Sequence, residues 1–431
     1  MNKKVLFVYP RFERHADANP ELRQFVPMNE YMGSPSLGLA SLAAMMPTGW
    51  EVEYRDDRIT PADASTDADL VALSFFTPAA TRGMQLADFF RAQGKTVVAG
   101  GIFPTAMPEI VAPHVDAVVI GESETTWPSV LADHLAGALR PVYGPIIADL
   151  DHAPVPKLDM YFAAETPQAR MDDYPLQISR GCPLTCSACM LPTSMGNRMR
   201  TFPLAHVLAQ LDQLTSAGKL ACLTEDTSWF VGAPGWTRMS ELFDVLADRP
   251  APISYVGISM PMILTIPSAA LQRARRAGVK MFYLVGGFDP ITTRAFTGKD
   301  PRAYTRAVDV IRKCNDNGID PYTSFLYGLD DDDEGTVDRI LSFCEEAGVH
   351  KAEFAVFTPY PGTPSYRKLT QEGRILTHDW HRYNDANVVY QPAQMSPEAV
   401  HQGYLRLWRE FYAGKAEWFQ SLPQGERTIQ F

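Results

Sequence analysis

The chain alternates short apolar, strand-like runs with amphipathic helical stretches almost from end to end, in two successive series. Strands that alternate with helices imply parallel sheets packed against those helices. A chain of 431 residues is too long for one ordinary core and suits two or three domains. We therefore predict an α/β fold with a doubly wound, Rossmann-like domain, then a partial (β/α)6 TIM-type barrel and a helical C-terminal region.

The first series predicts a domain over residues 1–145. Ligands of doubly wound sheets bind beyond the carboxyl ends of the strands, and glycine there lets a large flat ligand approach the backbone. Any single turn glycine is also explained by chain reversal alone, but several such turns together favour a site. The predicted strands are 4–9, 51–55, 70–75, 96–99 and 117–120, the helices are 38–46 and 81–93, and the turns of interest are 10–11, 74–81, 100–104 and 121–124.

A proline-rich stretch at 141–156 is typical of a linker, and we place the inter-domain linker at 146–170. The barrel is predicted over 171–366, with catalytic groups at the strand C-termini. Residues 367–431 form the C-terminal region, whose aromatic-rich helical part at 395–420 either caps the barrel or walls a substrate cavity. The predicted strands are 176–179, 221–224, 254–258, 281–285, 321–327 and 352–357, and the helices are 204–217, 267–277, 301–317 and 334–347.

Charge and hydropathy narrow the partners. A net charge of −11 argues against nucleic acid as the main partner, because phosphate binding needs a basic surface. No apolar run reaches the roughly 18–20 residues of a membrane span, and the apolar N-terminal run is too short for a signal peptide. We therefore expect a cytoplasmic protein whose main partner is not nucleic acid.

Three cysteines, Cys182, Cys186 and Cys189, lie within eight residues in the spacing C-x3-C-x2-C. Three thiolates on one loop can hold three irons of a [4Fe–4S] cubane and leave the fourth iron open to a substrate. A zinc site needs a fourth ligand, and His206 has no partner nearby; a cluster for electron transfer alone, or a disulfide with a spare thiol, is a further alternative. The scattered Cys222, Cys314 and Cys344 are predicted to be buried.

The triplet after a predicted first barrel strand resembles the radical S-adenosylmethionine superfamily. The resemblance extends to a subfamily with a cobalamin-binding N-terminal domain, which includes anaerobic magnesium-protoporphyrin cyclase and the hopanoid and bacteriochlorophyll methylases. The segments that carry it are Gly33-Ser34-Pro35-Ser36-Leu37-Gly38-Leu39-Ala40, Gly100-Gly101, Gly121-Glu122-Ser123-Glu124, Pro359-Tyr360-Pro361-Gly362-Thr363-Pro364 and Gly373-Arg374-Ile375-Leu376-Thr377.

This resemblance implies site residues. Cys182, Cys186 and Cys189 would hold the cluster. The residues implied to contact S-adenosylmethionine are Ala188, Met190, Glu225, Asp226, Ser259, Gly287 and Asp289. Asp289 is one methylene shorter than the glutamate that the family usually has there. For these strand-end polar residues, a helix cap or a turn is the structural alternative. The residues implied to contact cobalamin are Ser34, Ser36, Leu37, Gly38, Ser74, Thr77, Gly100, Gly101, Gly121, Glu122 and Glu124.

The chain departs from many cobalamin proteins, because the turn after its first strand lacks Asp-x-His-x-x-Gly. His15 stands alone there, and we expect it to be a solvated side chain. By resemblance, the lower face of cobalt has no histidine ligand, which suits cycling through Co(I). Arg11, Thr77 and Arg82 are expected to approach that face.

The function implied by the resemblance is a cobalamin-dependent radical C-methyltransferase, which acts on an unactivated carbon through a 5′-deoxyadenosyl radical. An external one-electron reductant of the flavodoxin or ferredoxin type is implied. A radical enzyme that does not methylate (a cyclase, a ring contraction or a dehydration or deoxygenation) is the alternative, and a sensory cofactor-binding protein is a third hypothesis. Aromatic residues favour an apolar or planar substrate; they are Tyr360, Trp380, Tyr383, Tyr390 and Trp408.

Overall fold

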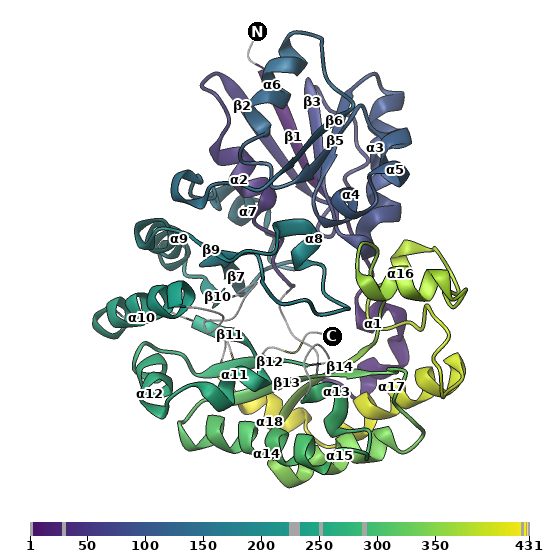
Figure 1. The fold of residues 1–431 in the computed structure, drawn as a ribbon. Coiled ribbons are helices and arrows are strands. Elements are labelled where there is room, and N and C mark those ends of the chain that lie inside the picture. Colours follow the sequence, from purple (N-terminus) through teal and green to yellow (C-terminus); the bar gives the residue numbers. More distant parts are fainter. Residues whose placement is uncertain are drawn as a thin grey trace.

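The computed structural model describes residues 3–27, 32–223, 233–249, 253–286, 291–423, 426–427 and 429. In these residues the strands form two six-stranded parallel sheets and a two-stranded antiparallel pair. Figure 1 shows the first sheet and its helices at the top and the second sheet below. The predicted α/β class is confirmed.

The first sheet has the strand order β2-β1-β3-β4-β5-β6. The chain leaves β1 on one side for β2 and then crosses to β3 on the other side. This reversal is a topological switch point, where strand ends diverge and leave a crevice. The strands are β1 (Lys3–Tyr9), β2 (Trp50–Asp56), β3 (Leu70–Ser74), β4 (Thr96–Gly100), β5 (Ala117–Gly121) and β6 (Val142–Ile146).

Both faces of the first sheet are buried, as a doubly wound sheet requires. Along β1, Leu6 and Val8 belong to one core cluster, while Val5 and Phe7 belong to another. Alternate side chains of a strand point to opposite faces, so the two clusters cover opposite faces of the first sheet. The helices are α3 (Ala80–Ala92), α4 (Ile102–Ala106) and α5 (Pro108–Val111) on the first face, and α2 (Gly38–Ala44), α6 (Trp127–Leu135) and α7 (Asp159–Ala164) on the second.

The proline-rich stretch at 141–156 differs from the plain linker that its composition suggests. Its first part is strand β6, which pairs with β5 and completes the first sheet. Tyr143 explains the difference, because its ring is buried and its hydroxyl donates to Asp133 at 2.8 Å. Proline is tolerated in β6 because that strand lies at the sheet edge.

The second sheet has the sequential order β14-β13-β12-β11-β10-β7. Its strands agree with the predicted series to within about three residues, but closure into a partial barrel stays a prediction, because β7 and β14 stand at the two edges of the described sheet. The strands are β7 (Asp173–Leu176), β10 (Leu220–Leu223), β11 (Ile253–Ser259), β12 (Met281–Val285), β13 (Asp320–Tyr327) and β14 (Lys351–Val356).

The prediction that the first strand of this sheet runs directly into the cysteines was wrong. Strand β7 ends at Leu176, and a separate short strand, β8 (Ser179–Arg180), precedes the cysteines. It pairs antiparallel with β9 (Arg200–Thr201), outside the parallel sheet. The segment Leu176-Gln177-Ile178-Ser179 hid this break, because its strand-like alternation of apolar and polar residues continues from one strand into the other.

Helices cover the outer side of the second sheet (Figure 1). Helix α17 packs on the edge strand β14, where the indole of Trp408 donates to the Phe354 carbonyl at 3.0 Å. The opposite side carries a small separate cluster of Cys222, Tyr255, Met281 and Tyr322. The helices are α9 (Leu204–Ser216), α10 (Ala233–Asp248), α11 (Met260–Thr265), α12 (Ser268–Arg276), α13 (Thr292–Ala295), α14 (Pro301–Asp316), α15 (Thr336–Ala347), α17 (Pro397–Tyr412) and α18 (Ala416–Ser421).

The C-terminal region joins the two halves of the molecule. After α16 (Pro364–Gln371), the chain returns to the first half, where the Trp380 ring lies 5.2 Å from the ring of Phe103 in α4. Tyr383 belongs to the same core cluster. In the described residues no helix is long and apolar enough to cross a membrane.

Candidate functional site

A cavity of about 480 Å³ opens at the switch point of the first sheet. The predicted cobalamin contacts, apart from Thr77, line it together; they are Ser34, Ser36, Leu37, Gly38, Ser74, Gly100, Gly101, Gly121, Glu122 and Glu124. Thr77 is buried at the start of a short 3-10 helix instead. We call this space the first cavity.

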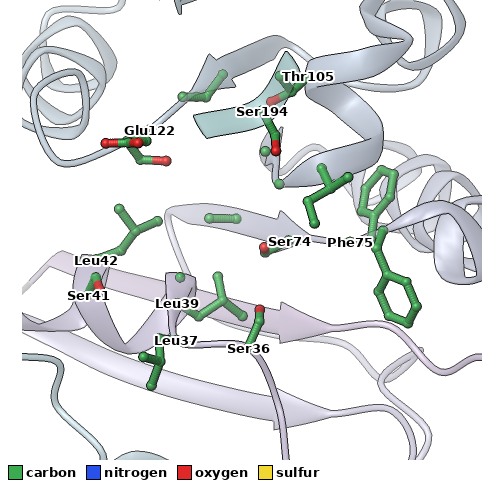
Figure 2. A pocket seen from close by; sticks show the side chains of 18 of the residues that line it. Ser36, Leu37, Leu39, Ser41, Leu42, Ser74, Phe75, Thr105, Glu122 and Ser194 are labelled. Atoms are coloured by element: carbon green, nitrogen blue, oxygen red, sulfur yellow. The ribbon is translucent and has the colours of Figure 1, made fainter. Parts of the chain in front are cut away.

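Helix α2 and the end of strand β3 shape the first cavity. In Figure 2, Leu39 and Leu42 of α2 face a space that Ser74 also borders, while Glu122 and Ser194 lie across it. Leucine, valine and tryptophan side chains contribute to the lining, and serines such as Ser74 at the end of β3 add polar groups. Such a mainly apolar cavity with a few polar groups suits a large organic cofactor.

Glycine is required where β4 ends. Gly101 has a φ of +100°, and a Cβ there would lie 2.8 Å from the Phe75 carbonyl oxygen and 3.0 Å from Ser74 Oγ. A side chain at this position would therefore strain the backbone and push into the strand ends. Because neither glycine has a side chain, the Gly100-Gly101 turn lines the first cavity with backbone atoms, which a ligand can approach closely.

Two arginines hold the carboxylates that follow β5. Glu122 accepts hydrogen bonds from both terminal nitrogens of Arg200, and Arg180 Nη1 lies 2.7 Å from Glu124 Oε1. Glu122 also accepts from the Ala148 amide at 2.9 Å. Sequence reasoning identified both glutamates but missed their arginine partners, of which Arg180 precedes Cys182 by two residues and Arg200 follows Cys189 by eleven.

Two of the three residues expected near the lower face of cobalt, Arg11 and Arg82, lie beside the same carboxylate, Asp57. Arg82 is held by Asp57 through two hydrogen bonds of 2.7 and 2.9 Å, and this ion pair lowers the pKa of the Asp57 carboxyl. Arg11 is exposed and lies 3.9 Å from the same carboxyl. Thr77 is buried, and the approach of these three residues to the lower face of cobalt stays a prediction.

The prediction of a solvated His15 was wrong. His15 is the first residue of helix α1 (His15–Ala18), and its Nδ1 lies 3.1 Å from the hydroxyl of Tyr404 on α17. Burial lowers the pKa of His15 to about 4. The contact joins segments 389 residues apart, so no local sequence signal could reveal it.

The cysteines lie on the segment 181–199, between β8 and β9, which we call the cysteine loop. Cys182 is buried and Cys186 and Cys189 are half-buried. In the described residues no three His, Cys, Asp or Glu side chains are gathered to hold a metal. The donor set still fits an iron–sulfur cluster, because cubanes take thiolates and this loop carries three.

The cysteine loop is fastened at both ends and along its length. The Cys182 amide donates to the Gly196 carbonyl at 3.1 Å, which closes the loop near its base. The Ser365 amide donates to the Ser187 carbonyl at 2.9 Å, and Thr193 donates to the Gly362 carbonyl at 3.1 Å. A Cβ on Gly181, whose φ is +82°, would lie 2.3 Å from the Arg198 carbonyl oxygen.

The predicted S-adenosylmethionine contacts are described only in part. Ala188 and Met190 lie on the cysteine loop, and the Met190 side chain reaches the space beside Gly362. Ser259 ends strand β11 and precedes α11. The other four, Glu225, Asp226, Gly287 and Asp289, lie outside the described residues.

A second cavity, of about 760 Å³, lies between the two halves of the molecule, and charged side chains line much of it. Asp173 accepts from Ser254 Oγ at 2.8 Å, and Glu353 accepts from the Tyr283 hydroxyl at 2.7 Å. Burial raises the pKa of Asp173 to about 6, of Glu353 to about 7 and of Asp385 to about 6. We call this space the second cavity.

Sequence reasoning missed these three carboxyl groups. Glu353 stands inside the apolar run 351–356, where a charged residue on a buried strand was the available signal. Asp385 has a φ of +61° although it is not glycine, and this strain cannot be read from sequence. The scattered Cys222, Cys314 and Cys344 are buried, as predicted.

Three comparisons agree with this arrangement. Residues 32–131 match the B12 binding domain family. The bacteriochlorophyllide d C-8(2)-methyltransferase of Chlorobaculum tepidum is 24% identical over 413 residues, which span 91% of this chain and 89% of that protein.

Two solved structures share the fold over most of the chain. The radical S-adenosylmethionine methyltransferase TsrM of Kitasatospora setae, with cobalamin and a [4Fe–4S] cluster bound, has a TM-score of 0.63 at 15% identity and covers 94% of this chain and 85% of its own. The cobalamin-dependent S-adenosylmethionine radical enzyme OxsB has a TM-score of 0.69 at 13% identity and covers 93% of this chain and 65% of its own. The chain therefore carries a B12 binding domain over residues 32–131 and shares its fold with these two cobalamin-binding S-adenosylmethionine radical enzymes.

Proposed function

We propose that this chain is a cobalamin-dependent radical S-adenosylmethionine enzyme that transfers a methyl group to an unactivated carbon of a small molecule. One observation carries the proposal: the first cavity and the cysteine loop share a wall, since Arg180, Ser194 and Met195 of the loop region line that cavity. Two cofactor sites that touch can serve one reaction. The relative from Chlorobaculum tepidum is named a methyltransferase.

The residues that hold each cofactor follow from the two sites. Cys182, Cys186 and Cys189 would ligate the cluster, and the bare Gly100-Gly101 turn would receive the cobalamin. When bound, the cluster supplies the electron that cleaves S-adenosylmethionine and the cobalamin supplies the methyl group. The chain itself contributes position and exclusion of water, through the fastened loop and the buried walls of both cavities.

The second cavity is the proposed place for the substrate, because it lies where the two halves face each other. Carboxyl groups with pKa values of about 6 to 7 hold a proton over part of the physiological range. They can then donate hydrogen bonds to a polar group of the substrate without a buried charge. Asp173, Glu353 and Asp385 would so orient the substrate.

The apolar or planar character of the substrate stays a prediction. Four of the five aromatic residues behind it, Trp380, Tyr383, Tyr390 and Trp408, are buried in packed cores. Tyr360 lines the second cavity, beside the carboxyl groups. The external one-electron reductant of the flavodoxin or ferredoxin type is likewise proposed from the chemistry of the cluster, which cannot start without an electron.

The experiment is an anaerobic turnover assay with reconstituted cluster, cobalamin, reductant and extracts of candidate small molecules. Methyl transfer yields S-adenosylhomocysteine together with 5′-deoxyadenosine, and the product gains the mass of one CH₂. Formation of 5′-deoxyadenosine alone with the true substrate would favour a radical reaction without methylation. Absence of S-adenosylmethionine cleavage by fully loaded protein would reject the enzyme reading altogether.

A further inference from the structure

The base of the cysteine loop places two positive charges face to face. Strands β8 and β9 pair so that Arg180 stands directly opposite Arg200, one at each end of the loop. Like charges directly opposite on paired strands destabilise the pairing. This two-residue pairing therefore needs a source of negative charge to hold the loop closed.

The first half of the molecule supplies that charge. Glu122 receives a two-pronged pair of hydrogen bonds from Arg200, and Arg180 Nη1 lies 3.5 Å from Glu122 and 2.7 Å from Glu124. Arg200 also donates to the Met195 carbonyl of the loop at 2.8 Å and to the Ala148 carbonyl at 2.6 Å. One guanidinium thus ties the loop, the first sheet and the segment after β6 together.

These four side chains are well shielded from solvent. The exposed fractions are 3% for Glu122, 10% for Glu124, 9% for Arg180 and 17% for Arg200. Removal of one member would leave a buried, uncompensated charge, which costs far more than the loss of a surface ion pair. The loop base therefore depends on the glutamates that follow β5.

Three of these four side chains form part of the wall of the first cavity. Glu122, Glu124 and Arg180 line the cavity, and so do Ser194 and Met195 of the loop. Arg200 does not line it, although it holds both Glu122 and Met195. A change in the conformation of the cysteine loop is therefore expected to shift the wall of the first cavity. A molecule bound in that cavity is expected to affect the conformation of the loop in return.

We propose that Glu122, Glu124, Arg180 and Arg200 form a latch that couples cobalamin binding in the first cavity to cluster binding on the cysteine loop. The four are positioning residues, which act through the loop and the cavity wall. The proposal rests on the proposed function, because it takes this chain to bind both cofactors. Coupling of this kind is reciprocal: each cofactor strengthens binding of the other by the same factor.

The test measures cobalamin affinity of the full chain with and without its reconstituted cluster, by anaerobic equilibrium filtration with retained cobalt quantified. In the unchanged protein we expect the cluster to strengthen cobalamin binding about ten-fold, within the usual range of such coupling. In Arg200→Gln the ratio of the two affinities should fall to about one. A uniform loss of affinity would leave that ratio unchanged, so a merely structural role gives a different result.

Lys219→Gln is the matched control. Lys219 forms an ion pair of 2.6 Å with Glu165, and its side chain is 17% exposed, as is that of Arg200, but it touches neither the loop nor the first cavity. This control should keep the ten-fold ratio of the unchanged protein. Arg200→Lys keeps the charge but loses the two-pronged geometry, so its ratio should be intermediate, and it carries the test if Arg200→Gln does not fold.

The outcomes separate the latch from the proposed function. A ratio of one in an unchanged protein that binds both cofactors overturns the latch alone, as does an Arg200→Gln protein with the full ratio. Failure of the unchanged protein to take up either iron or cobalamin overturns the proposed function, and the latch with it.

Discussion

The two halves of the molecule build their sites by different means. In the first half the strand order itself reverses, so the ends of β1 and β3 diverge and leave a crevice that turn residues line. In the second half the strand order is sequential, and the cysteines lie on a loop outside the parallel sheet. The first site is therefore fixed by topology, whereas the second depends on contacts with the first.

The two cavities also differ in how their carboxyl groups are compensated. Glu122 and Glu124 beside the first cavity are neutralised by arginines. Asp173 and Glu353 in the second cavity are hydrogen-bonded to hydroxyl groups, and burial raises the pKa of each carboxyl. The carboxylates beside the first cavity are thus paired with positive charges. In the second cavity the carboxyl groups can carry a proton and donate a hydrogen bond to a ligand.

The sharpest test of the second half is the loss of one thiol. Replacing Cys182, Cys186 or Cys189 with Ala should abolish S-adenosylmethionine cleavage, because a cubane loses one of the thiolates that this loop offers. Bound iron and 5′-deoxyadenosine formation under reducing conditions measure the effect. Full cleavage by the Cys186→Ala protein would overturn the cluster assignment.

Cys344→Ala serves as the control for the thiol variants. Cys344 belongs to helix α15, far along the chain from the loop, and burial raises the pKa of its thiol. The variant should retain its iron and its cleavage activity, with a loss of stability of about 1 kcal/mol for the smaller side chain.

The first half is tested by closing its cavity from the backbone side. In Gly101→Ala the new Cβ meets the Phe75 carbonyl at 2.8 Å, so the strand ends must shift. A rearrangement that costs about 1–3 kcal/mol of binding free energy corresponds to a loss of cobalamin affinity of about five-fold to 150-fold. Anaerobic cobalamin titration of the purified protein gives the dissociation constant.

Gly94→Ala isolates the steric part of that effect. Gly94 also has a positive φ, of +75°, but a Cβ there meets nothing within 4 Å. Both variants should lose stability through backbone strain, of the order of 1–2 kcal/mol. Equal loss of cobalamin affinity in both would show that the Gly101 contact does not shape the cavity.

The two halves also differ in how much of their sites the sequence predicts, because one site is formed by turns after strands and the other depends on contacts between distant segments. Turn residues that directly follow strands can be read from the local pattern, and Ser74 and Gly101, which were singled out in this way, line one cavity. The arginine partners of Glu122, and the contact between His15 and Tyr404, join segments far apart in the chain. Such contacts depend on how the two halves pack, which no local periodicity encodes.

The carboxyl groups of the second cavity should reveal themselves in the pH dependence of stability. Burial raises the pKa of Glu353 from its ordinary value of 4.5 to about 7. Between these values the folded chain holds a proton that the unfolded chain has lost, so stability falls as pH rises from about 4.5 to about 7 and then levels off.

Glu353→Gln should remove that penalty, because glutamine is neutral at every pH and its oxygen can still accept from Tyr283. At pH 8 the variant should exceed the unchanged protein in stability by at most about 3 kcal/mol, with a smaller difference near pH 5. Thermal unfolding at the two pH values measures this. Glu51→Gln, at a side chain that is 62% exposed, is the control and should show no such pH-dependent difference.

The smallest expected effect is at His15, the lone histidine after β1. Its Nδ1 lies 3.1 Å from the Tyr404 hydroxyl, and it lines the second cavity but not the first. His15→Gln should therefore leave the cobalamin dissociation constant within about two-fold and cost about 1 kcal/mol of stability. His206→Gln is a matched control, since that ring lies 3.2 Å from the Ala153 carbonyl.

The spectrum of bound cobalamin makes the His15 test decisive. A histidine below cobalt adds nitrogen splitting to the electron paramagnetic resonance signal of Co(II), and its loss changes that signal. Identical signals from the unchanged and the His15→Gln proteins are expected. A changed signal, or lost binding in His15→Gln alone, would make His15 a cobalt ligand and would overturn its placement outside the first cavity.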